Sequence, residues 1–402
     1  MRYNAIMLLT VAGVLTITGS AKALEYQITI IEPTGLAYPF CINDNGQMVG
    51  SIGTSNNYDS FIWKDGNFTL LNKPNDVDSM IARSINNSGQ IVGECLMPPS
   101  YAFAIRGFLL EGESLLYLPP LGSNQLSTAY GINNRGYIAG QARENGNTRL
   151  GCVWEPVTLN PNNITDIVGI SWGRAMGIND NNEAVGDFST SSNPARRAFI
   201  YDDVNGLRDI GVLPGQVQSY GYAINNKSQV VGYSTGSPDG YHAFLYDDSN
   251  GVMTDLGTLN GAVDSAAYSI SNSGIIVGRS IWADDSAKGC LWIDGQIIDV
   301  NNLLYTDLDW TITLTRSINN NGRIVGTGVL DGQGYAILLT PVGHLNYDND
   351  VDLKDLAIFG SSWGRSDCND LNNWCGNTDI NHNGKVDLPD LGKLTEHWLE
   401  NK

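Results

Sequence analysis

The sequence predicts an all-β fold, a seven-bladed β-propeller of four-stranded blades, followed by a small α-helical calcium-binding module. Three observations predict the propeller. One unit recurs seven times at a nearly constant spacing, each unit divides into four short strand segments, and the last unit lacks a strand that the other end of the chain supplies. A period in the forties with four strands per unit is typical of propeller blades.

The first residues have the features of a secretory signal peptide. Met1 and Arg2 form a short positive region, residues 5–18 are mostly apolar, and Ala21-Lys22-Ala23 fits an A-x-A cleavage site. We therefore expect residues 1–23 to be a signal peptide, with a buried N-terminal helix as the alternative. The protein is then secreted, extracellular or at the cell surface, or periplasmic. No later segment has 18 consecutive apolar residues, so no membrane span is expected.

The charge of the chain argues against a nucleic-acid partner. The 402 residues carry 42 Asp and Glu against 23 Lys and Arg, a net charge of −19. Binding to phosphate requires clustered Lys and Arg side chains, and this composition lacks that excess.

The repeated unit centres on the stretch Ile-Asn-Asn-Ser-Gly-Gln-Ile-Val-Gly at residues 85–93. Equivalent stretches are spaced 43, 47, 46, 46, 46 and 48 residues apart and begin at Ile42, Ile85, Ile132, Ile178, Ile224, Ile270 and Ile318. A single copy could be a ligand-binding loop, but seven copies in register favour a hairpin turn. We expect Ile85 to pack between blades, Gly89 to adopt positive φ, and Gly93 to allow close packing or a bulge.

The strands of the propeller can be assigned within one unit. In the sixth unit we expect strands at residues 266–271, 275–281, 289–293 and 296–300, since these runs are short and rich in β-branched or aromatic residues. The seventh unit ends after its third strand, and residues 26–31 resemble the missing fourth. Residues 24–342 should therefore close into a ring, whereas a linear solenoid would not need the split unit.

The units also resemble a known family. With Tyr-His-Ala-Phe-Leu-Tyr at 241–246 as the clearest example, they are similar to the HAF-type extracellular repeats of bacteria. The resemblance implies an exported propeller-like array and no defined activity.

Residues 379–390 have the spacing of an EF-hand loop. Side-chain oxygens occur at positions 1, 3, 5, 9 and 12, Gly384 is at position 6, and position 7 can use its backbone carbonyl. The expected ligands are Asp379, Asn381, Asn383, Lys385, Asp387 and Asp390. Calcium takes six to eight oxygen ligands, so this loop is predicted to bind Ca²⁺. An Asn- and Asp-rich turn is the alternative.

A second copy of the pattern lies 35 residues upstream. Its expected ligands are Asn346, Asp348, Asp350, Asp352 and Asp355. We call this upstream copy the first loop and residues 379–390 the second loop. Position 1 of the first loop is His344 where the second loop has Asp, so the Ca²⁺ site of the first loop should be the weaker one. Each loop precedes an apolar series with helical spacing, which predicts two helices on a shared core: Leu353, Leu356, Phe359 and Trp363, and Leu388, Leu391, Leu394 and Trp398.

These paired loop–helix units at 343–402 resemble a type I dockerin. The resemblance implies a noncatalytic tag that binds a cohesin-like or surface scaffold protein through loop positions 10 and 11, here Leu353-Lys354 and Leu388-Pro389 rather than the Ser/Thr pair of cellulosomal members. Between the two units, Cys368 and Cys375 lie close together in a polar loop of an exported chain, and we expect them to form a disulfide.

No catalytic constellation is recognisable. G-x-S-x-G occurs three times, around Ser171, Ser234 and Ser362, but without the strand-to-helix context of a nucleophile elbow. Pairs of Asp at 202–203, 247–248 and 284–285 are better explained as turn residues, and His242 as a structural histidine. Trp172, Trp282 and Trp310 lie outside the repeated positions and either stack on sugars or pack between blades.

Three functions remain open from the sequence. A noncatalytic exported protein whose propeller binds polysaccharide or protein is the preferred hypothesis. A propeller glycoside hydrolase or polysaccharide lyase with a dockerin tag is the second, with catalytic residues in irregular loops such as 94–107 and 187–197. The third is a purely structural surface protein.

Overall fold

The protein is described by a computed structural model that places residues 25–32, 34, 37–54, 57–98, 105–122, 126–144, 148–165, 169–237, 240–306, 308–343, 345, 351, 353–368, 373–381 and 383–396. The expected signal peptide lies outside these residues. So do four ligands of the first calcium loop, Asn346, Asp348, Asp350 and Asp352.

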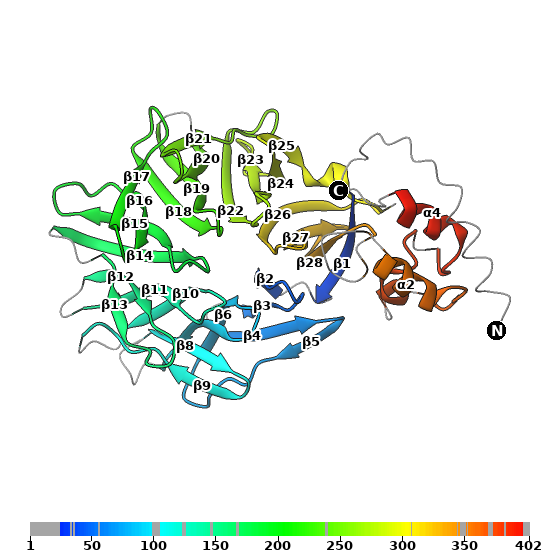
Figure 1. Ribbon diagram of the computed structural model, residues 1–402, viewed down its shortest axis with the longest axis horizontal. Helices are drawn as coiled ribbons and strands as arrows, with labels where there is room; N and C mark the ends of the chain where they lie inside the picture. Colours follow the sequence, from blue (N-terminus) through cyan, green and yellow to red (C-terminus); the bar gives the residue numbers. More distant parts are fainter. Residues whose placement is uncertain are drawn as a thin grey trace.

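The described residues form seven four-stranded antiparallel sheets arranged around a common centre (Figure 1). The predicted seven-bladed propeller is therefore confirmed. Blade 1 contains β2 (Ala37–Ile42), β3 (Met48–Thr54), β4 (Asn57–Lys64) and β5 (Asn67–Leu70). Blade 2 contains β6 (Ser79–Ile85), β7 (Ile91–Leu96), β8 (Ile105–Glu111) and β9 (Ser114–Tyr117). Blade 3 contains β10 (Ser127–Ile132), β11 (Ile138–Arg143), β12 (Arg149–Trp154) and β13 (Pro161–Asn163).

The next three blades repeat this order. Blade 4 contains β14 (Ile170–Ile178), β15 (Ala184–Thr190), β16 (Arg197–Asp202) and β17 (Gly206–Gly211). Blade 5 contains β18 (Gln218–Ile224), β19 (Gln229–Ser237), β20 (Gly240–Asp247) and β21 (Val252–Asp255). Blade 6 contains β22 (Asp264–Ile270), β23 (Ile276–Ile281), β24 (Ala287–Ile293) and β25 (Gln296–Asp299), which is followed by a short 3₁₀ helix, η2 (Val300–Leu303).

The two ends of the repeat region meet in blade 7. This blade contains β26 (Thr311–Ile318), β27 (Ile324–Leu330), β28 (Gln333–Pro341) and β1 (Tyr26–Glu32). β1 pairs antiparallel with β28, and Ile28 lies opposite Leu339. The N-terminal strand thus supplies the fourth strand of the last blade, and the ring has no open strand edge at its closure.

The core lies between the blades and uses the repeated third strand. Phe61, Phe108, Phe199 and Phe244 occupy one position of this strand in four blades, and all are fully buried. Cys152 and Cys290 take the same position in blades 3 and 6, where both are buried free thiols. There the adjacent tryptophans Trp154 and Trp292 fill the space and donate their indole N–H to backbone carbonyls.

The Ile-Asn-Asn-Ser-Gly stretch forms the turn between the first and second strands of each blade. In blade 2, the Oδ1 atom of Asn86 accepts hydrogen bonds from the backbone N–H groups of Ser88 and Gln90, at 3.1 and 3.0 Å. Gly89 adopts a φ of +81°, which glycine reaches without a steric penalty. The stretch is therefore a capped hairpin turn, as its seven copies indicate.

The residue after each turn asparagine links its blade to the neighbouring blades. Its backbone N–H donates to the side-chain oxygen of the equivalent residue in the next blade, at 2.8–3.0 Å. We call the seven residues the polar ring: Asp44, Asn87, Asn134, Asp180, Asn226, Asn272 and Asn320. The last bond runs from Asn320 to Asp44, so the chain of hydrogen bonds closes across the two ends of the repeat region.

A second set of inter-blade bonds starts from the turn asparagines. The Nδ2 atoms of Asn43, Asn86, Asn133, Asn179, Asn225 and Asn319 each donate to the backbone carbonyl of the equivalent residue in the next blade, at 2.8–3.1 Å. Blade 6 has Ser271 at this position, and its hydroxyl interacts only within its own turn among the described residues. Among the described residues, the bond that a turn asparagine makes to the next blade is therefore missing between blades 6 and 7, although other hydrogen bonds join these blades.

Replacing Ser271 with asparagine should supply this link. The new amide can donate to the carbonyl of Asn319, as Asn225 donates to that of Ser271. One intramolecular hydrogen bond adds about 0.5–1.5 kcal/mol, so the midpoint of urea unfolding should rise by a corresponding amount. Ser271→Ala, which removes the bond from the N–H of Ile275 to the Ser271 hydroxyl, should lower it. A midpoint for Ser271→Asn at or below that of the wild type would contradict this reading of the turn.

The C-terminal module lies beside blade 7, next to β1 and β28 (Figure 1). Among the described residues it contains three short helices, α2 (Leu353–Ser362), α3 (Asn373–Asn377) and α4 (Leu388–Glu396). The side chain of Gln27 in β1 donates to the carbonyl of Ile380 at 3.2 Å, and Lys393 pairs with Glu25 at 3.8 Å. No helix among the described residues is long and apolar enough to cross a membrane.

Candidate functional site

The first strand of every blade carries a β-bulge at the same place. In blade 5, Gly221 pairs with Gly232 and Ala223 pairs with Val231, so Tyr222 is an extra residue without a partner in the ladder. The same register shift occurs in all seven first strands. We call the seven extra residues the bulge ring: Phe40, Arg83, Tyr130, Met176, Tyr222, Tyr268 and Arg316.

The glycine of the repeated Ile-Val-Gly motif explains why the bulge forms there. A Cβ atom on Gly232 would overlap the carbonyl oxygen of Tyr220 in the facing strand. The equivalent glycines of the other blades, including Gly93, face a first-strand carbonyl in the same way. Only glycine allows the two backbones to approach this closely, and the facing strand accommodates its extra residue beside this contact.

The bulges direct their side chains into a cavity at the centre of the propeller, and this cavity has a volume of about 200 Å³. All seven members of the bulge ring line it. The first strands that carry the ring, from β2 to β26, surround the centre in Figure 1. The polar ring lines a second cavity next to this one. Isoleucines of the repeated turns, such as Ile132 and Ile224, line both cavities.

Two arginines of the bulge ring lie among aromatic side chains. The guanidinium of Arg316 lies 4.9 Å from the ring centre of Tyr268 and 6.0 Å from that of Phe40. The guanidinium of Arg83 lies 5.7 Å from Phe40 and 5.4 Å from Tyr130, and it also pairs with Glu94. Such arrangements are attractive because the face of an aromatic ring is electron-rich.

A cluster of tyrosines extends from the cavity over blades 5 and 6. We call it the tyrosine wall; its neighbouring ring centres are 4.8–5.8 Å apart, and its members are Tyr220, Tyr222, Tyr233, Tyr241 and Tyr268. Burial raises the pKa of Tyr220, Tyr222, Tyr233 and Tyr241 above the ordinary value. Their hydroxyl groups stay protonated at neutral pH, as those of ordinary tyrosines do, and the hydroxyl of Tyr220 donates to the side chain of Gln218 at 2.8 Å.

A buried ion cluster borders the tyrosine wall on blade 4. Asp187 is fully buried, and its two carboxylate oxygens accept hydrogen bonds from Arg174 and Arg196 at 2.8 and 3.1 Å. Burial raises the pKa of Asp187, and the two guanidinium groups act in the opposite direction. Both guanidiniums also lie over the indole ring of Trp172.

The three tryptophans outside the repeated positions differ in how deeply they are buried. Trp310 is buried in the core beside Tyr335, which agrees with packing between blades. Trp172 and Trp282 are half-buried, and each lies near a cationic side chain.

The residues that suggest catalysis are part of the scaffold. Ser171 and Ser234 lie within strands β14 and β19 rather than at a strand-to-helix turn, and Ser362 ends helix α2. The first aspartate of each Asp pair accepts a backbone N–H two residues ahead, as turn residues do. His242 pairs with Asp255 between β20 and β21, away from the bulge ring.

In the second predicted calcium loop, Asp379 and Asp390 are held by the loop backbone, but the carboxylates of Asp379, Asp387 and Asp390 do not form a group with oxygens within 4.8 Å of one another. Asp379 and Asp390 are both buried, and their carboxylates accept backbone N–H groups of the loop at 2.8–3.1 Å. The Oδ1 atom of Asp387 is buried and has no hydrogen-bond partner among the described residues. Gly384 has a φ of +89°, as the sharp turn requires. A buried oxygen without a hydrogen-bond partner, in a loop that also buries two carboxylates, fits a loop that holds a hard cation such as Ca²⁺.

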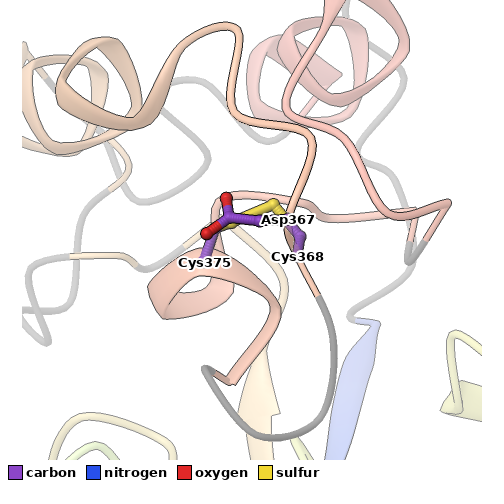
Figure 2. A group of neighbouring side chains, drawn as sticks. All are labelled: Asp367, Cys368 and Cys375. Carbon is purple, nitrogen blue, oxygen red and sulfur yellow. A yellow bond between two sulfur atoms is a disulfide. The ribbon is translucent and has the colours of Figure 1, made fainter.

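Cys368 and Cys375 are joined by a disulfide whose Cα atoms are 4.9 Å apart. Figure 2 shows Asp367 beside this bond, and the carboxylate and the two sulfurs lie close enough together to resemble a metal site. Because both sulfurs are used in the disulfide, no thiolate is present to bind a metal. The bond ties α3 to the segment that follows α2.

The predicted packing of the module helices is wrong at their first positions and at Trp363, which is 44% exposed, while Trp398 lies outside the described residues. Phe359 and Leu394 are buried in the shared core, but Leu353 and Leu388 are 72% and 67% exposed. A helix advances 100° per residue, so a spacing of three falls about 60° short of a full turn at each step. Two such steps carry Leu353 and Leu388 away from the buried face.

The bulge ring is the part of the site that the sequence analysis missed. A signal was present, because the position two residues before each repeated Ile-Asn pair holds a large or charged side chain in every unit. In a regular strand, side chains alternate between the two faces of the sheet. The bulge breaks this alternation and turns the side chain of the extra residue toward the centre of the propeller.

Comparisons with known proteins identify a family and a fold. The sequence profile of the family described as "Protein of unknown function (DUF3466)" matches residues 114–350. No curated protein matches the sequence. The chain is similar in structure to TolB from Acinetobacter baumannii, with 13% identity, a TM-score of 0.41, and coverage of 77% of this chain and 86% of that one.

Two further solved structures are similar at the same level. One is the β-propeller domain of the Trilobed protease from Pyrococcus furiosus, with 11% identity, a TM-score of 0.45, and coverage of 66% and 81% of the two chains. The other is a Mycobacterium tuberculosis puromycin-hydrolyzing peptidase, with 11% identity, a TM-score of 0.48, and coverage of 79% and 56%. Likenesses of this size do not bear on what this chain binds or catalyses.

Proposed function

The chain belongs to the family described as "Protein of unknown function (DUF3466)". For this member of the family, we propose that it is an exported, noncatalytic binding protein. Its propeller presents a ligand-binding surface for polysaccharide, and its C-terminal module anchors it to a partner. The observation that supports this proposal is the bulge ring, which places guanidinium and aromatic groups around one cavity on a rigid scaffold. Binding sites combine such a preformed concave surface with a few polar groups that orient the ligand.

The module is proposed to bind Ca²⁺ and to dock on a cohesin-like or surface scaffold protein. In the second loop, Asp379, Asp387 and Asp390 would hold the ion together with Asn381, Asn383 and the carbonyl of Lys385. Asp355, which ends the first loop, is buried, as Asp390 is in the second. Leu353 and Leu388 stand exposed at equivalent positions of the two units, so a partner can contact either of them. Export to the exterior or periplasm stays a prediction from residues 1–23.

A carbohydrate-active enzyme is the second candidate function. The observation that favours it is Asp187, a buried carboxyl group whose pKa is raised by burial and which lies beside two arginines near the tyrosine wall. Perturbed carboxyl groups of this kind occur at active sites, although structural ion clusters also produce them.

One experiment separates these functions. The full-length protein is incubated with a panel of neutral and acidic polysaccharides, and both binding and cleavage are measured. We expect retention of at least one polysaccharide, with no new reducing ends and no unsaturated products. Cleavage that is lost in Asp187→Asn would replace the proposal with the enzyme. Absence of binding to every polysaccharide would contradict the proposal, and absence of binding to proteins as well would favour a structural surface protein.

A further inference from the structure

Arginines gather at the centre of the propeller, although the chain as a whole is acidic. The whole chain has a net charge of −19. Yet five arginines gather around the bulge ring and the tyrosine wall: Arg83, Arg174, Arg196, Arg279 and Arg316. Among the described residues, the carboxylates that pair with them are those of Glu94 and Asp187.

Arg316 has no counter-ion among the described residues. Its half-buried guanidinium lies between the rings of Phe40 and Tyr268, and it makes no hydrogen bond or ion pair with any described residue. Burial lowers the pKa of Arg316, which shows that its charge is poorly solvated. An unpaired guanidinium at such a position is unfavourable, and an anion that enters the cavity would relieve this cost.

Arg279 extends the same cationic surface on blade 6. Its guanidinium lies 5.9 Å from the ring centre of Tyr268, on which Arg316 also lies, and it contacts the hydroxyl group of Tyr241. Its Nε atom is buried and has no hydrogen-bond partner among the described residues. Two guanidiniums with unused donors thus flank a single tyrosine ring.

We propose that the bulge ring binds the carboxylate or sulfate group of an acidic polysaccharide, with Arg316 as its main ligand and Arg279 at the side. This inference rests on the proposed binding function and specifies its ligand class. The cavity of about 200 Å³ admits one anionic substituent, and the half-buried tyrosine wall beside it can contact the adjoining sugars. A guanidinium matches the planar geometry of a carboxylate with two parallel hydrogen bonds.

The acidic exterior argues against nucleic acid as the anion. Neutralising the phosphates of a nucleic acid takes an excess of clustered Lys and Arg, which a chain of net charge −19 lacks. The tyrosine wall favours a glycan over an acidic peptide, because it is a cluster of aromatic side chains rather than a free strand edge.

The test measures affinities of the full-length protein by calorimetry. The probes are oligogalacturonate, its methyl-esterified form, a sulfated dextran oligosaccharide, neutral dextran and oligoglutamate. We expect the methyl ester, which lacks the charge, to bind at least tenfold more weakly than the acid. The ratio of sulfated to carboxylated affinity identifies which anion the site takes.

Variants connect the affinity to the site. Arg316→Gln should lose at least tenfold in affinity, and Arg316→Lys should lose less because it keeps the charge. Arg197→Gln is the matched control, since Arg197 pairs with Asp209 on outer strands, and it should stay within twofold. Arg316→Gln should melt close to the wild type, because the variant loses the ring contacts to Tyr268 and Phe40 but no described hydrogen bond or ion pair. If it fails to fold, Arg279→Gln provides the same comparison.

The outcomes that overturn the inference differ from those that overturn the proposed function. Equal affinity for the acid and its ester, unchanged affinity in Arg316→Gln, or tightest binding to oligoglutamate would each contradict the anionic-glycan site. Binding of neutral dextran alone would do so while leaving the proposed function intact. Failure to bind any glycan would contradict the proposed function itself.

Discussion

The Gly232→Ala variant will unfold at a markedly lower urea concentration than the wild type. The added methyl group would overlap the carbonyl oxygen of Tyr220 in the facing strand, and this backbone atom cannot move without breaking the ladder of β18 and β19. Overpacking of this kind costs about 1–3 kcal/mol and more where only backbone can yield, so we expect a loss at or above the upper end of that range. The measurement is equilibrium unfolding followed by tryptophan fluorescence.

Gly334→Ala is the control for this prediction. Gly334 lies exposed in β28, and a Cβ atom placed there meets no heavy atom within 4 Å. The variant should stay within about 0.5 kcal/mol of the wild type. Equal stabilities of Gly232→Ala and Gly334→Ala would show that the repeated glycine does not serve the bulge. A folded Gly232→Ala protein should also bind its glycan more weakly, because Tyr222 is the bulged residue opposite Gly232.

The double variant Asp379→Ala/Asp390→Ala will lose most of its response to calcium. Both carboxylates are buried in the second loop, and without them it keeps few of the oxygen ligands that Ca²⁺ requires. In the wild type, calcium at a thousandfold excess over its dissociation constant should stabilise the module by about 4 kcal/mol, and a chelator should reverse this. Calorimetry should show at least a hundredfold weaker binding in the variant.

Lys385→Ala is a control for the same assignment, because it should leave calcium binding intact. Position 7 of the loop contributes its backbone carbonyl, so removing the exposed side chain should leave calcium affinity within about threefold. An unchanged calcium response in the double variant would refute the assignment of this loop. A large loss in Lys385→Ala would contradict the proposed role of the carbonyl.

The sequence predicts the scaffold well because a repeat gives seven independent observations of each position. The strands expected in the sixth unit differ from β22–β25 by at most two residues at any boundary. The pairing of β1 with β28 follows from counting strands in the last unit. The hairpin turn at Asn86 and Gly89 follows from turn chemistry that is local to the chain.

The site could not be predicted in the same way because it depends on distances between blades. The bulge at Arg316 is visible only when the register of β26 against β27 is known. The unpaired state of Arg316 depends on the side chains of neighbouring blades, and Tyr268 lies 48 residues away in the sequence. The prediction for Leu353 and Leu388 was wrong because residues three apart on a helix do not lie on quite the same side of it. After two such steps these leucines point away from the small buried core of the module.

The repeated bulge also has a consequence for how this scaffold can evolve. The glycine contact and the hairpin turns specify where seven inward-facing side chains are placed, but they do not specify which side chains these are. Phenylalanine, arginine, tyrosine and methionine already share this position within one chain. Substitutions at a few positions of the bulge ring can therefore change its ligand specificity while the fold remains intact. The scaffold is for this reason suited to the engineering of receptors for a chosen ligand.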